Sequence, residues 1–383
     1  MMRRPQLLID AGDYSLDIES AYGTGLRLSE LADALSHDCD VRVFAPGTVA
    51  PLPLGSAELV TDQAKWDCLL RSSHIALFTD LADESRLMQA AAAGLSIVTE
   101  NAPPIEHLEY PSLLASKDPV RAHQDMVRTY VRQLRLSSHF LCRSQVEKVS
   151  LVANLCIQGR LAPTDIAASR TLDHLISLVP IGFSWASARI ARDTVAEPLA
   201  DFLWTGGIWS FYQPEMLVDA VAVCRDRGID TSAAFLYAEP VPDNRTLIDG
   251  LRERIERRGV ADRVLLHRGA LSHDQRDRYL KGARALVALG RPGVENETCV
   301  RLRIRDSRLY GKPLIVDSYG ATGAEVALSG RGVALADPTA ESVADALVRC
   351  LTADPDRGAP DGRYTYERTL DNFLSWAHRA SQS

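Results

Sequence analysis

Short apolar runs alternate with helical hydrophobic patterns along this chain, and this alternation constrains its fold more than any other feature. In the first half, strands are predicted at 6–9, 40–44, 74–78, 95–99, 140–142 and 176–179, and helices at 25–35, 85–93 and 119–134. Such alternation is typical of βαβ units, in which helices connect the strands of a parallel sheet. The first half is therefore predicted to be an α/β domain.

The alternation stops near residue 183 and restarts at Asp201, after a polar stretch at 184–198 that we interpret as a linker. The second half has predicted helices at 214–225, 244–258 and 273–281, and predicted strands at 201–205, 233–237, 263–267, 285–288 and 314–316. A chain of 383 residues exceeds one ordinary core, so two α/β domains are expected, at 1–183 and 184–363. Residues 364–380 have the pattern of an amphipathic helix.

Composition narrows the class of protein. The formal net charge of −7 argues against a dedicated nucleic-acid binder. The seven cysteines are scattered and form no CxxC pair, which is typical of reduced thiols in a cytoplasmic protein. No stretch approaches the roughly 20 apolar residues of a membrane span, although a peripheral membrane contact stays open.

An arginine-rich stretch at 291–313 is the strongest functional signal. The chain as a whole is acidic, so a local cluster of arginines needs a specific reason. Two acids come first and four arginines follow, with one more acid among them and a Gly-Lys-Pro end: Glu295, Glu297, Arg301, Arg303, Arg305, Asp306 and Arg308. Planar, permanently charged guanidinium groups suit a phosphate or diphosphate ligand, and the acids could accept hydrogen bonds from hydroxyl groups.

The spacing ranks these arginines if residues 299–310 form one helix. Arg301, Arg305 and Arg308 would then share one face, and Arg303 would share the opposite face with Asp306. Arginines at the start of a helix act together with its dipole on the same anion, which favours Arg301 and Arg303. The alternative is a solvated stripe, or an ordinary Arg303–Asp306 pair.

Two glycine loops are candidate binding sites. Thr205-Gly206-Gly207 follows the first strand of the second half and precedes Ile208 and Trp209, so a ligand could approach its backbone closely. Gly23-Thr24-Gly25 opens a helix in the first half, where free N–H groups could hold an anion or a hydroxyl group. The alternative for each is a tight turn without a ligand.

The remaining polar candidates are Glu100 and Asn101, at the end of the fourth predicted strand. Glu100 could act on a substrate, or it could be a loop or capping acid. The histidines have no metal-like spacing with a carboxylate, so no metal site is expected.

Taken in order, these residues resemble the GT-B glycosyltransferases, in particular a bacterial branch of glycosyltransferase family 4. The resemblance is carried by Ile97-Val-Thr-Glu-Asn-Ala-Pro-Pro-Ile105, by His139-Phe-Leu-Cys-Arg-Ser-Gln145 with Ile157-Gln-Gly-Arg160 and Leu178-Val-Pro-Ile-Gly182, by Trp204-Thr-Gly-Gly-Ile-Trp209 with Pro214, and by Glu295-Asn through Arg301-Leu-Arg303, Asp306 and Gly311-Lys-Pro313. It spans nearly the whole chain. Glu100 stands where the branch usually has an aspartate.

The resemblance implies two Rossmann-like domains facing a cleft, with residues 364–383 returning to the first domain. It implies retaining transfer from a nucleoside-diphosphate sugar to a small-molecule or glycan acceptor, without a metal ion or another cofactor. The implied catalytic residues are Glu295, Arg301, Arg303 and Glu100. The implied donor-binding residues are Gly206, Gly207, Ile208, Trp209, Glu297, Arg301, Arg303, Asp306 and Thr322, and those on the acceptor side are Gly23, Thr24, Gly25 and Asn101.

Within these sets the resemblance gives particular roles. Arg301 and Arg303 would hold the diphosphate, Glu295 would lie near the sugar, and Asp306 would lie near the ribose or support the arginines.

Three other interpretations stay open. A nicotinamide-dependent oxidoreductase would also have two α/β halves, but no tight GxGxxG follows the first predicted strand. A catalytically silent GT-B protein that binds a nucleotide or a partner is favoured by the absence, at 210–213, of the Arg and Lys that many family 4 enzymes carry there. An enzyme that couples a sugar-like pseudosugar is the third.

Overall fold

The computed structural model describes residues 4–19, 23–100, 103–242, 244–269, 271–353 and 359–382. Asn101, which the resemblance assigns to the acceptor side, lies outside these ranges. The chain divides into two compact units. Unit 1 contains Met1–His107, Ser116–Ser187 and Gly362–Ser383, and unit 2 contains Leu108–Ala115 and Ala188–Asp361.

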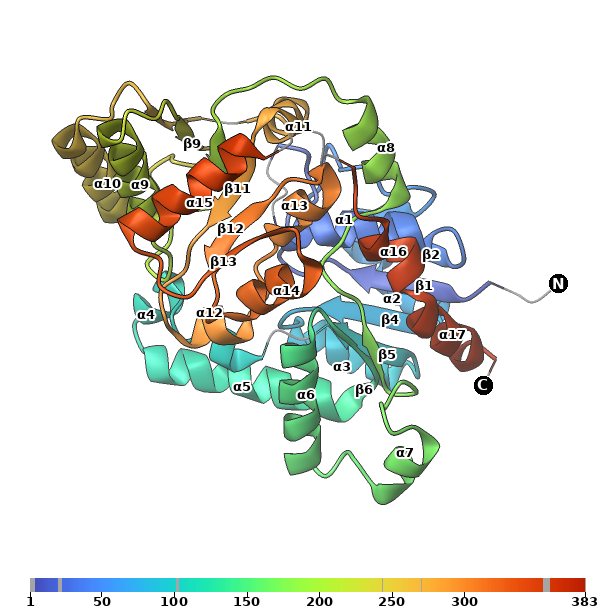
Figure 1. Cartoon of the computed structure of the whole chain (residues 1–383). Helices are drawn as coiled ribbons and strands as arrows, with labels where there is room; N and C mark the ends of the chain where they lie inside the picture. Colours follow the sequence, from blue (N-terminus) through green and yellow to red (C-terminus); the bar gives the residue numbers. More distant parts are fainter. Residues whose placement is uncertain are drawn as a thin grey trace. The chain divides into compact units, whose positions relative to one another are not determined.

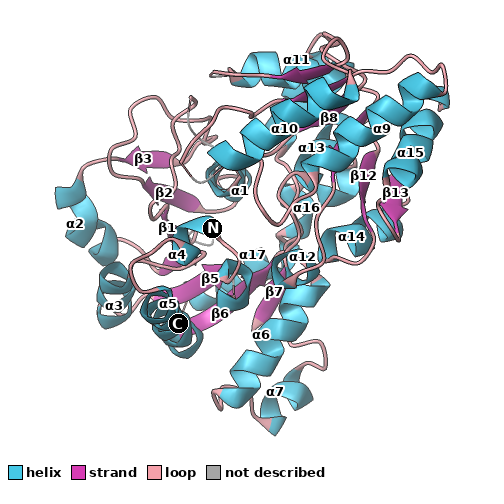
Figure 2. Cartoon of the chain, turned by 90° about the vertical axis from the view of Figure 1, so that its left-hand side faces the viewer, coloured by secondary structure: helices cyan, strands magenta, loops and turns pink. Residues whose placement is uncertain are grey.

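Unit 1 is built on a parallel sheet of seven strands in the order β3-β2-β1-β4-β5-β6-β7 (Figures 1 and 2). Its strands are β1 (Gln6–Asp10), β2 (Asp40–Phe44), β3 (Glu58–Val60), β4 (Ile75–Thr79), β5 (Ser96–Glu100), β6 (Ser137–Cys142) and β7 (Ile176–Leu178). The central strand β4 is buried along its whole length, as its uninterrupted apolar sequence requires in a sheet that is covered on both faces.

The helices of unit 1 connect these strands. They are α1 (Thr24–Leu35), η1 (Gln63–Lys65), α2 (Trp66–Arg71), α3 (Glu84–Ala92), η2 (Pro104–His107), α5 (Pro119–Leu136), α6 (Gln145–Ile157) and α7 (Pro163–Ala168). Local sequence sets several of their starts. Asp118 accepts a hydrogen bond from the Arg121 N–H at the start of α5, and Ser144 accepts one from the Glu147 N–H at the start of α6.

The end of the chain completes unit 1. It forms η4 (Gly362–Tyr364), α16 (Tyr366–Thr369) and α17 (Asp371–Ala380). Tyr366, Leu370 and Phe373 are fully buried in the same core as β1 and α1. This placement agrees with the predicted return of the last segment to the first domain.

Unit 2 is built on a parallel sheet of six strands in the order β10-β9-β8-β11-β12-β13. Its strands are β8 (Phe202–Trp204), β9 (Ala233–Phe235), β10 (Val264–Leu266), β11 (Ala285–Ala288), β12 (Leu314–Asp317) and β13 (Gly332–Leu335). Its helices are α4 (Pro111–Leu114), α9 (Pro214–Asp226), α10 (Arg245–Arg258), α11 (His273–Gly282), α12 (Val294–Thr298), α13 (Ile304–Tyr310), α14 (Ala321–Ser329) and α15 (Ala340–Thr352). The fold class predicted from the sequence, two Rossmann-like parallel α/β units, is confirmed.

Three predicted elements were wrong in detail. The stretch at 184–198, interpreted as a linker, contains a helix that the sequence did not predict, α8 (Trp185–Asp193), and the division between the two compact units falls within it. The helix predicted at 299–310 begins only at Ile304, since the Arg301 N–H bonds to the side chain of Thr322 instead of continuing a helical ladder. The predicted tail helix is broken into α16 and α17, which meet at Leu370.

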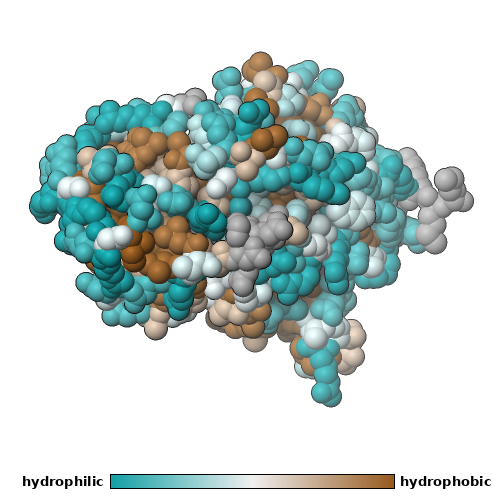
Figure 3. All heavy atoms as spheres, turned by 45° about the horizontal axis from the view of Figure 1, so that its top comes forward, coloured by the Kyte–Doolittle hydropathy of each residue, from teal (hydrophilic) through white to brown (hydrophobic). Residues whose placement is uncertain are grey.

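No helix among the described residues is long and apolar enough to cross a lipid bilayer. In the face drawn in Figure 3, hydrophilic side chains predominate between smaller apolar areas.

Candidate functional site

The loop that follows β8 is packed directly against Arg303. Trp204 ends β8, and Gly206 follows it by two residues in the loop. Both contact Arg303: its Cζ lies 5.3 Å from the centre of the Trp204 ring, and a Cβ atom on Gly206 would overlap the guanidinium. Gly206 is therefore required for the close approach of Arg303, whereas the sequence analysis expected a ligand to approach this backbone, which stays a prediction.

Arg303 has an unusual environment for a cation. Its Nη2 donates a hydrogen bond to the Gly207 carbonyl oxygen at 3.2 Å, and its Cζ lies 4.3 Å from the centre of the Tyr212 ring. Within the described residues its Nη1 is buried without a hydrogen-bond partner, and no carboxylate pairs with it. Burial lowers the pKa of Arg303, and the opposing effects of Tyr212 and Asp306 do not outweigh it.

Arg301, by contrast, is fully engaged inside unit 2. Its Nη1 lies 2.8 Å from Asp317 Oδ1 and its Nη2 lies 3.1 Å from Asp317 Oδ2. Its Nε donates to Asn296 Oδ1 at 3.0 Å, and its Nη1 also donates to the Ala288 carbonyl oxygen at 2.5 Å. Arg301 thus ties the ends of β11 and β12 to α12.

The other two arginines of the stretch also have acidic partners. Arg305 Nη1 lies 3.1 Å from Asp306 Oδ1, and Arg308 Nη2 lies 2.8 Å from Glu325 Oε2. Asp306 also pairs with Arg276 of α11 at 2.5 Å. Asp306 is thus buried between Arg305 and Arg276, and not paired with Arg301 or Arg303, the arginines that the resemblance expected it to support; its other expected place, near a ribose, stays a prediction.

The two acids of α12 differ in exposure. Glu295 is buried, whereas Glu297 is exposed. The pKa of Tyr212 is raised chiefly by burial, and the charge of Glu295 adds to the rise. Glu295 therefore lies near Tyr212, the residue whose ring contacts Arg303. At the start of α12, the Val294 N–H donates to Glu109 Oε1 at 2.9 Å.

The predicted donor residues are thus only partly brought together. Gly206, Gly207, Trp209 and Arg303 form one contact group, and a Cβ atom on Gly207 would lie 2.7 Å from Trp209 Nε1. Three predicted residues lie in the interior: Ile208 in the hydrophobic core, and Arg301 and Thr322 in a buried hydrogen-bonded network. Whether any of these residues contacts a ligand stays a prediction.

Sequence reasoning missed Tyr212 and Asp317. Tyr212 belongs to the aromatic run after the glycine loop, which is a visible signal, but nothing local shows that its ring would face an arginine. Asp317 ends β12, and its pairing with Arg301 follows only from the order of the strands.

In unit 1, Glu100 lies in a buried ion pair. Arg27 of α1 pairs with it, and both side chains are only 3% exposed. Arg27 also donates to the Val179 carbonyl oxygen at 2.8 Å and to the Tyr366 hydroxyl at 2.8 Å. The carboxylate that the resemblance marked as catalytic therefore has a structural partner already.

The predicted acceptor loop lies beside a polar cluster at the carboxyl edge of the same sheet. Thr24 interacts with Tyr14, whose hydroxyl donates to Asp80. His107 Nε2 lies 3.4 Å from Asp80 Oδ1. Burial alone would raise the pKa of Asp80, but hydrogen bonds from His107 and Tyr14 outweigh it and the pKa is lowered, so Asp80 is a carboxylate at neutral pH.

A cavity of about 410 Å³ lies elsewhere in unit 1 and contains none of the predicted site residues. Its lining is mostly polar: Gln63, Ala64, Trp66, Asp67, Asp83, Ser85, Arg86 and Gln89. Within the described parts of the chain, no three His, Cys, Asp or Glu side chains are grouped so that they could hold a metal ion.

Comparison with known proteins identifies the fold. No protein-family model and no curated protein matches the sequence. Solved structures do match along nearly the whole chain. Sucrose-phosphate synthase from Thermosynechococcus elongatus matches with a TM-score of 0.56 and 17% identity, covering 99% of this chain and 98% of that one.

AviGT4, a glycosyltransferase involved in avilamycin A biosynthesis, matches with a TM-score of 0.60 and 13% identity, covering 99% and 98%. Anabaena Alr3699/HepE, solved in complex with UDP, matches with a TM-score of 0.56 and 14% identity, covering 99% and 97%. The fold is that of the GT-B glycosyltransferases. At these identities the likeness concerns the fold, so the activity is argued from the site.

Proposed function

We propose that the protein is a glycosyltransferase that takes a sugar from a nucleoside-diphosphate sugar and transfers it to a hydroxyl group or an amine. The observation that carries this proposal is Arg303, a cation without a carboxylate partner at the Gly206–Gly207 loop. A buried, uncompensated guanidinium is costly unless it meets an anion. The diphosphate of a nucleotide sugar is an anion of the right chemistry.

The proposed reaction mainly needs cations and backbone dipoles near the diphosphate oxygen on which negative charge develops. When the bond between the sugar and the diphosphate breaks, the electron pair stays with the phosphate oxygen, and Arg303 stabilises that negative charge. The acceptor's oxygen or nitrogen bonds to the sugar carbon as that bond breaks, and the proton that the acceptor loses passes to the departing phosphate oxygen. Glu295, buried in the neighbouring helix, is the acid that we assign to the sugar.

We further propose that transfer retains the configuration of the sugar and uses no metal ion, as the family 4 resemblance implies. The charge that a metal would supply is assigned to Arg303 and to the backbone of the glycine loop. The stereochemistry is tested by NMR of the product's anomeric centre. Unchanged activity after treatment with a chelator is the expected result for metal independence.

The central test is Arg303→Ala. The protein is incubated with UDP-, ADP-, GDP- and dTDP-sugars and an acceptor panel, and products are identified by mass spectrometry. For the active pair, we expect Arg303→Ala to lower the transfer rate by about 10²–10³, the usual cost of losing one charge-stabilising donor.

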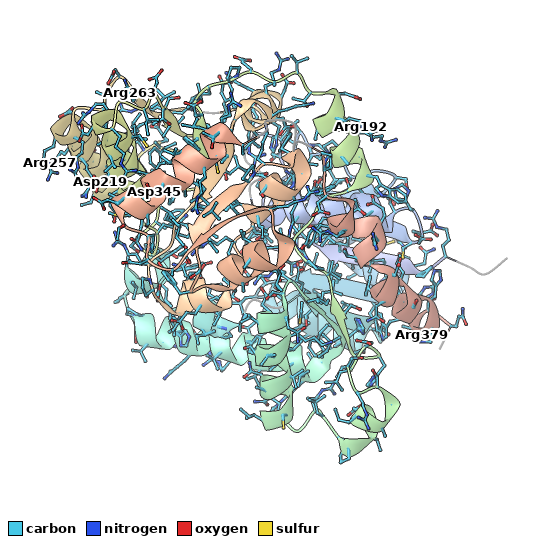
Figure 4. The ribbon with its side chains drawn as sticks, viewed as in Figure 1. Arg192, Asp219, Arg257, Arg263, Asp345 and Arg379 are labelled. Carbon is cyan, nitrogen blue, oxygen red and sulfur yellow. The ribbon has the colours of Figure 1, made fainter. Side chains whose placement is uncertain are left out.

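The control is Arg257→Ala, on the exposed surface of α10, where the side chain points outward (Figure 4). It should leave transfer unchanged. Near-normal turnover of a folded Arg303→Ala protein would refute the assignment.

A second candidate is a protein that binds a nucleotide without transferring a sugar. It is favoured by the Arg27–Glu100 pair, because a neutralised Glu100 offers no carboxylate to an acceptor. It predicts nucleotide binding in calorimetry, with no product from any pair in the panel.

A further inference from the structure

Two aromatic residues hold Arg303, Trp204 through its ring and Tyr212 through its ring and a side-chain hydrogen bond, whereas carboxylates hold its neighbours. The pairs of the neighbours are Arg301–Asp317, Arg305–Asp306 and Arg308–Glu325. A carboxylate neutralises the guanidinium that it holds. An aromatic face attracts a guanidinium and fixes its orientation, but leaves its charge in place for another anion.

Tyr212 supplies the nearer of the two rings, at 4.3 Å from Arg303 Cζ, against 5.3 Å for Trp204. The same Tyr212 ring lies 5.4 Å from Arg301 Cζ, so it lies near both guanidinium groups. Both rings belong to the core of unit 2, but Trp204 is fully buried whereas Tyr212 keeps 7% of its surface exposed, so Tyr212 is the ring that we alter.

The Tyr212 ring is held from several directions within unit 2. Its backbone N–H donates to the Trp209 carbonyl oxygen at 3.1 Å, and the residue forms an antiparallel bridge with Gly290 at the end of β11. The ring also packs edge-on against Phe211, with 4.5 Å between the ring centres. Its position is therefore set by the fold and not by a ligand.

We propose that Tyr212 is a positioning residue for anion binding: its ring holds the guanidinium of Arg303, still charged, at the Gly206–Gly207 loop. A free arginine side chain would lose conformational entropy when it meets a phosphate, and an arginine that is already ordered loses less. The nature of the anion, a phosphate group of a nucleotide, rests on the proposed function.

The test is calorimetric titration of the folded protein with UDP and with ADP. Tyr212→Leu removes the ring and should weaken binding of the better nucleotide by about tenfold, the scale of a partly buried cation–π contact. Tyr212→Phe keeps the ring and loses only the hydroxyl that bonds to Arg303, so it should weaken binding clearly less than Tyr212→Leu does. Thermal unfolding establishes that each variant is folded.

A double-mutant cycle separates positioning from a merely structural effect. If Tyr212 acts through Arg303, Tyr212→Leu should change nucleotide affinity little once Arg303→Gln is present. An equal loss in both backgrounds, or wild-type affinity in Tyr212→Leu, would overturn the proposal. A wild-type protein that binds neither nucleotide would instead contradict the proposed function, and the role of Tyr212 would fall with it.

Discussion

His139 shows how one residue of unit 1 sets a pH dependence. Its ring is fully buried, stacks on Trp376 with 4.6 Å between centres, and bonds through Nε2 to Ser177 Oγ at 2.8 Å. Burial lowers the pKa of His139 from 6.5 to about 3. The folded protein therefore keeps this imidazole neutral.

Because the folded pKa is below the unfolded one, stability is lost as the pH falls. Between pH 6.5 and about 3 the unfolded chain binds one more proton than the folded chain at this site, so unfolding becomes easier by about 1.4 kcal/mol per pH unit. We expect His139→Gln to remove that part of the slope between pH 6.5 and 4.5, measured by urea unfolding with tryptophan fluorescence. An unchanged slope would show that another group is responsible.

The arginine stretch at 291–313 shows how far the sequence alone could predict the anion-binding residues. It identified Arg303 by charge and position, and it favoured Arg301 equally. The difference between them depends on Asp317, sixteen residues further along, because β11 and β12 are neighbours in the sheet. The tertiary fold decides which acid pairs with Arg301 over such a separation. The spacing of residues along one helix cannot predict that pairing.

At the scale of elements, the Arg27–Glu100 pair joins α1 to the end of β5. Replacing Glu100 by Gln leaves the buried guanidinium of Arg27 without its countercharge, and we expect unit 1 to lose about 3–5 kcal/mol of unfolding free energy. The exposed pair Arg128–Asp125 is the matched control, and Arg128→Ala should cost less than about 1 kcal/mol.

Chemical denaturation of both variants measures this difference. If Glu100 is catalytic instead, Glu100→Gln would lose transfer while keeping wild-type stability. The two roles of Glu100 therefore predict opposite results in a single variant.

The accuracy with which the sequence predicted the bounds of each strand and helix differed for physical reasons. The bounds of β2 and β11 were predicted to the residue, because β2 alternates polar and apolar residues and β11 is a short apolar run. The three-residue strand β3 was not predicted, since it is too short to show a period and pairs along only one edge. The start of α13 was missed because a tertiary contact, Arg301 N–H to Thr322, ends the preceding turn.

At the scale of the whole molecule, the chain order and the compact units do not coincide. The segment 362–383 follows unit 2 in sequence but completes unit 1. Backbone hydrogen bonds tie this segment to Phe183: the Tyr366 N–H donates to the Phe183 carbonyl oxygen at 2.9 Å, and the Phe183 N–H donates to the Tyr364 carbonyl oxygen at 3.2 Å. Unit 1 therefore cannot finish folding until the last residues of the chain are available.

A chain that ends at Asp361 tests this dependence. It lacks five buried apolar side chains of the unit 1 core, namely Tyr366, Leu370, Phe373, Trp376 and Ala377. At about 1.5–3 kcal/mol for each large side chain, their loss is comparable with the whole stability of an ordinary domain. We expect backbone amides of β1, β4 and β7 to lose their protection in hydrogen exchange, while those of β8, β11 and β12 keep it.

A peptide of residues 362–383 supplies the control. Added in excess to the shortened chain, it should restore protection in unit 1, because it brings back the buried side chains without the covalent link. The same peptide with Phe373 replaced by Ser should restore less, since it places a hydroxyl group in the core in place of the aromatic ring. Full protection of β1 and β4 in the shortened chain alone would mean that unit 1 folds without its last segment, and the dependence argued from the core would be wrong.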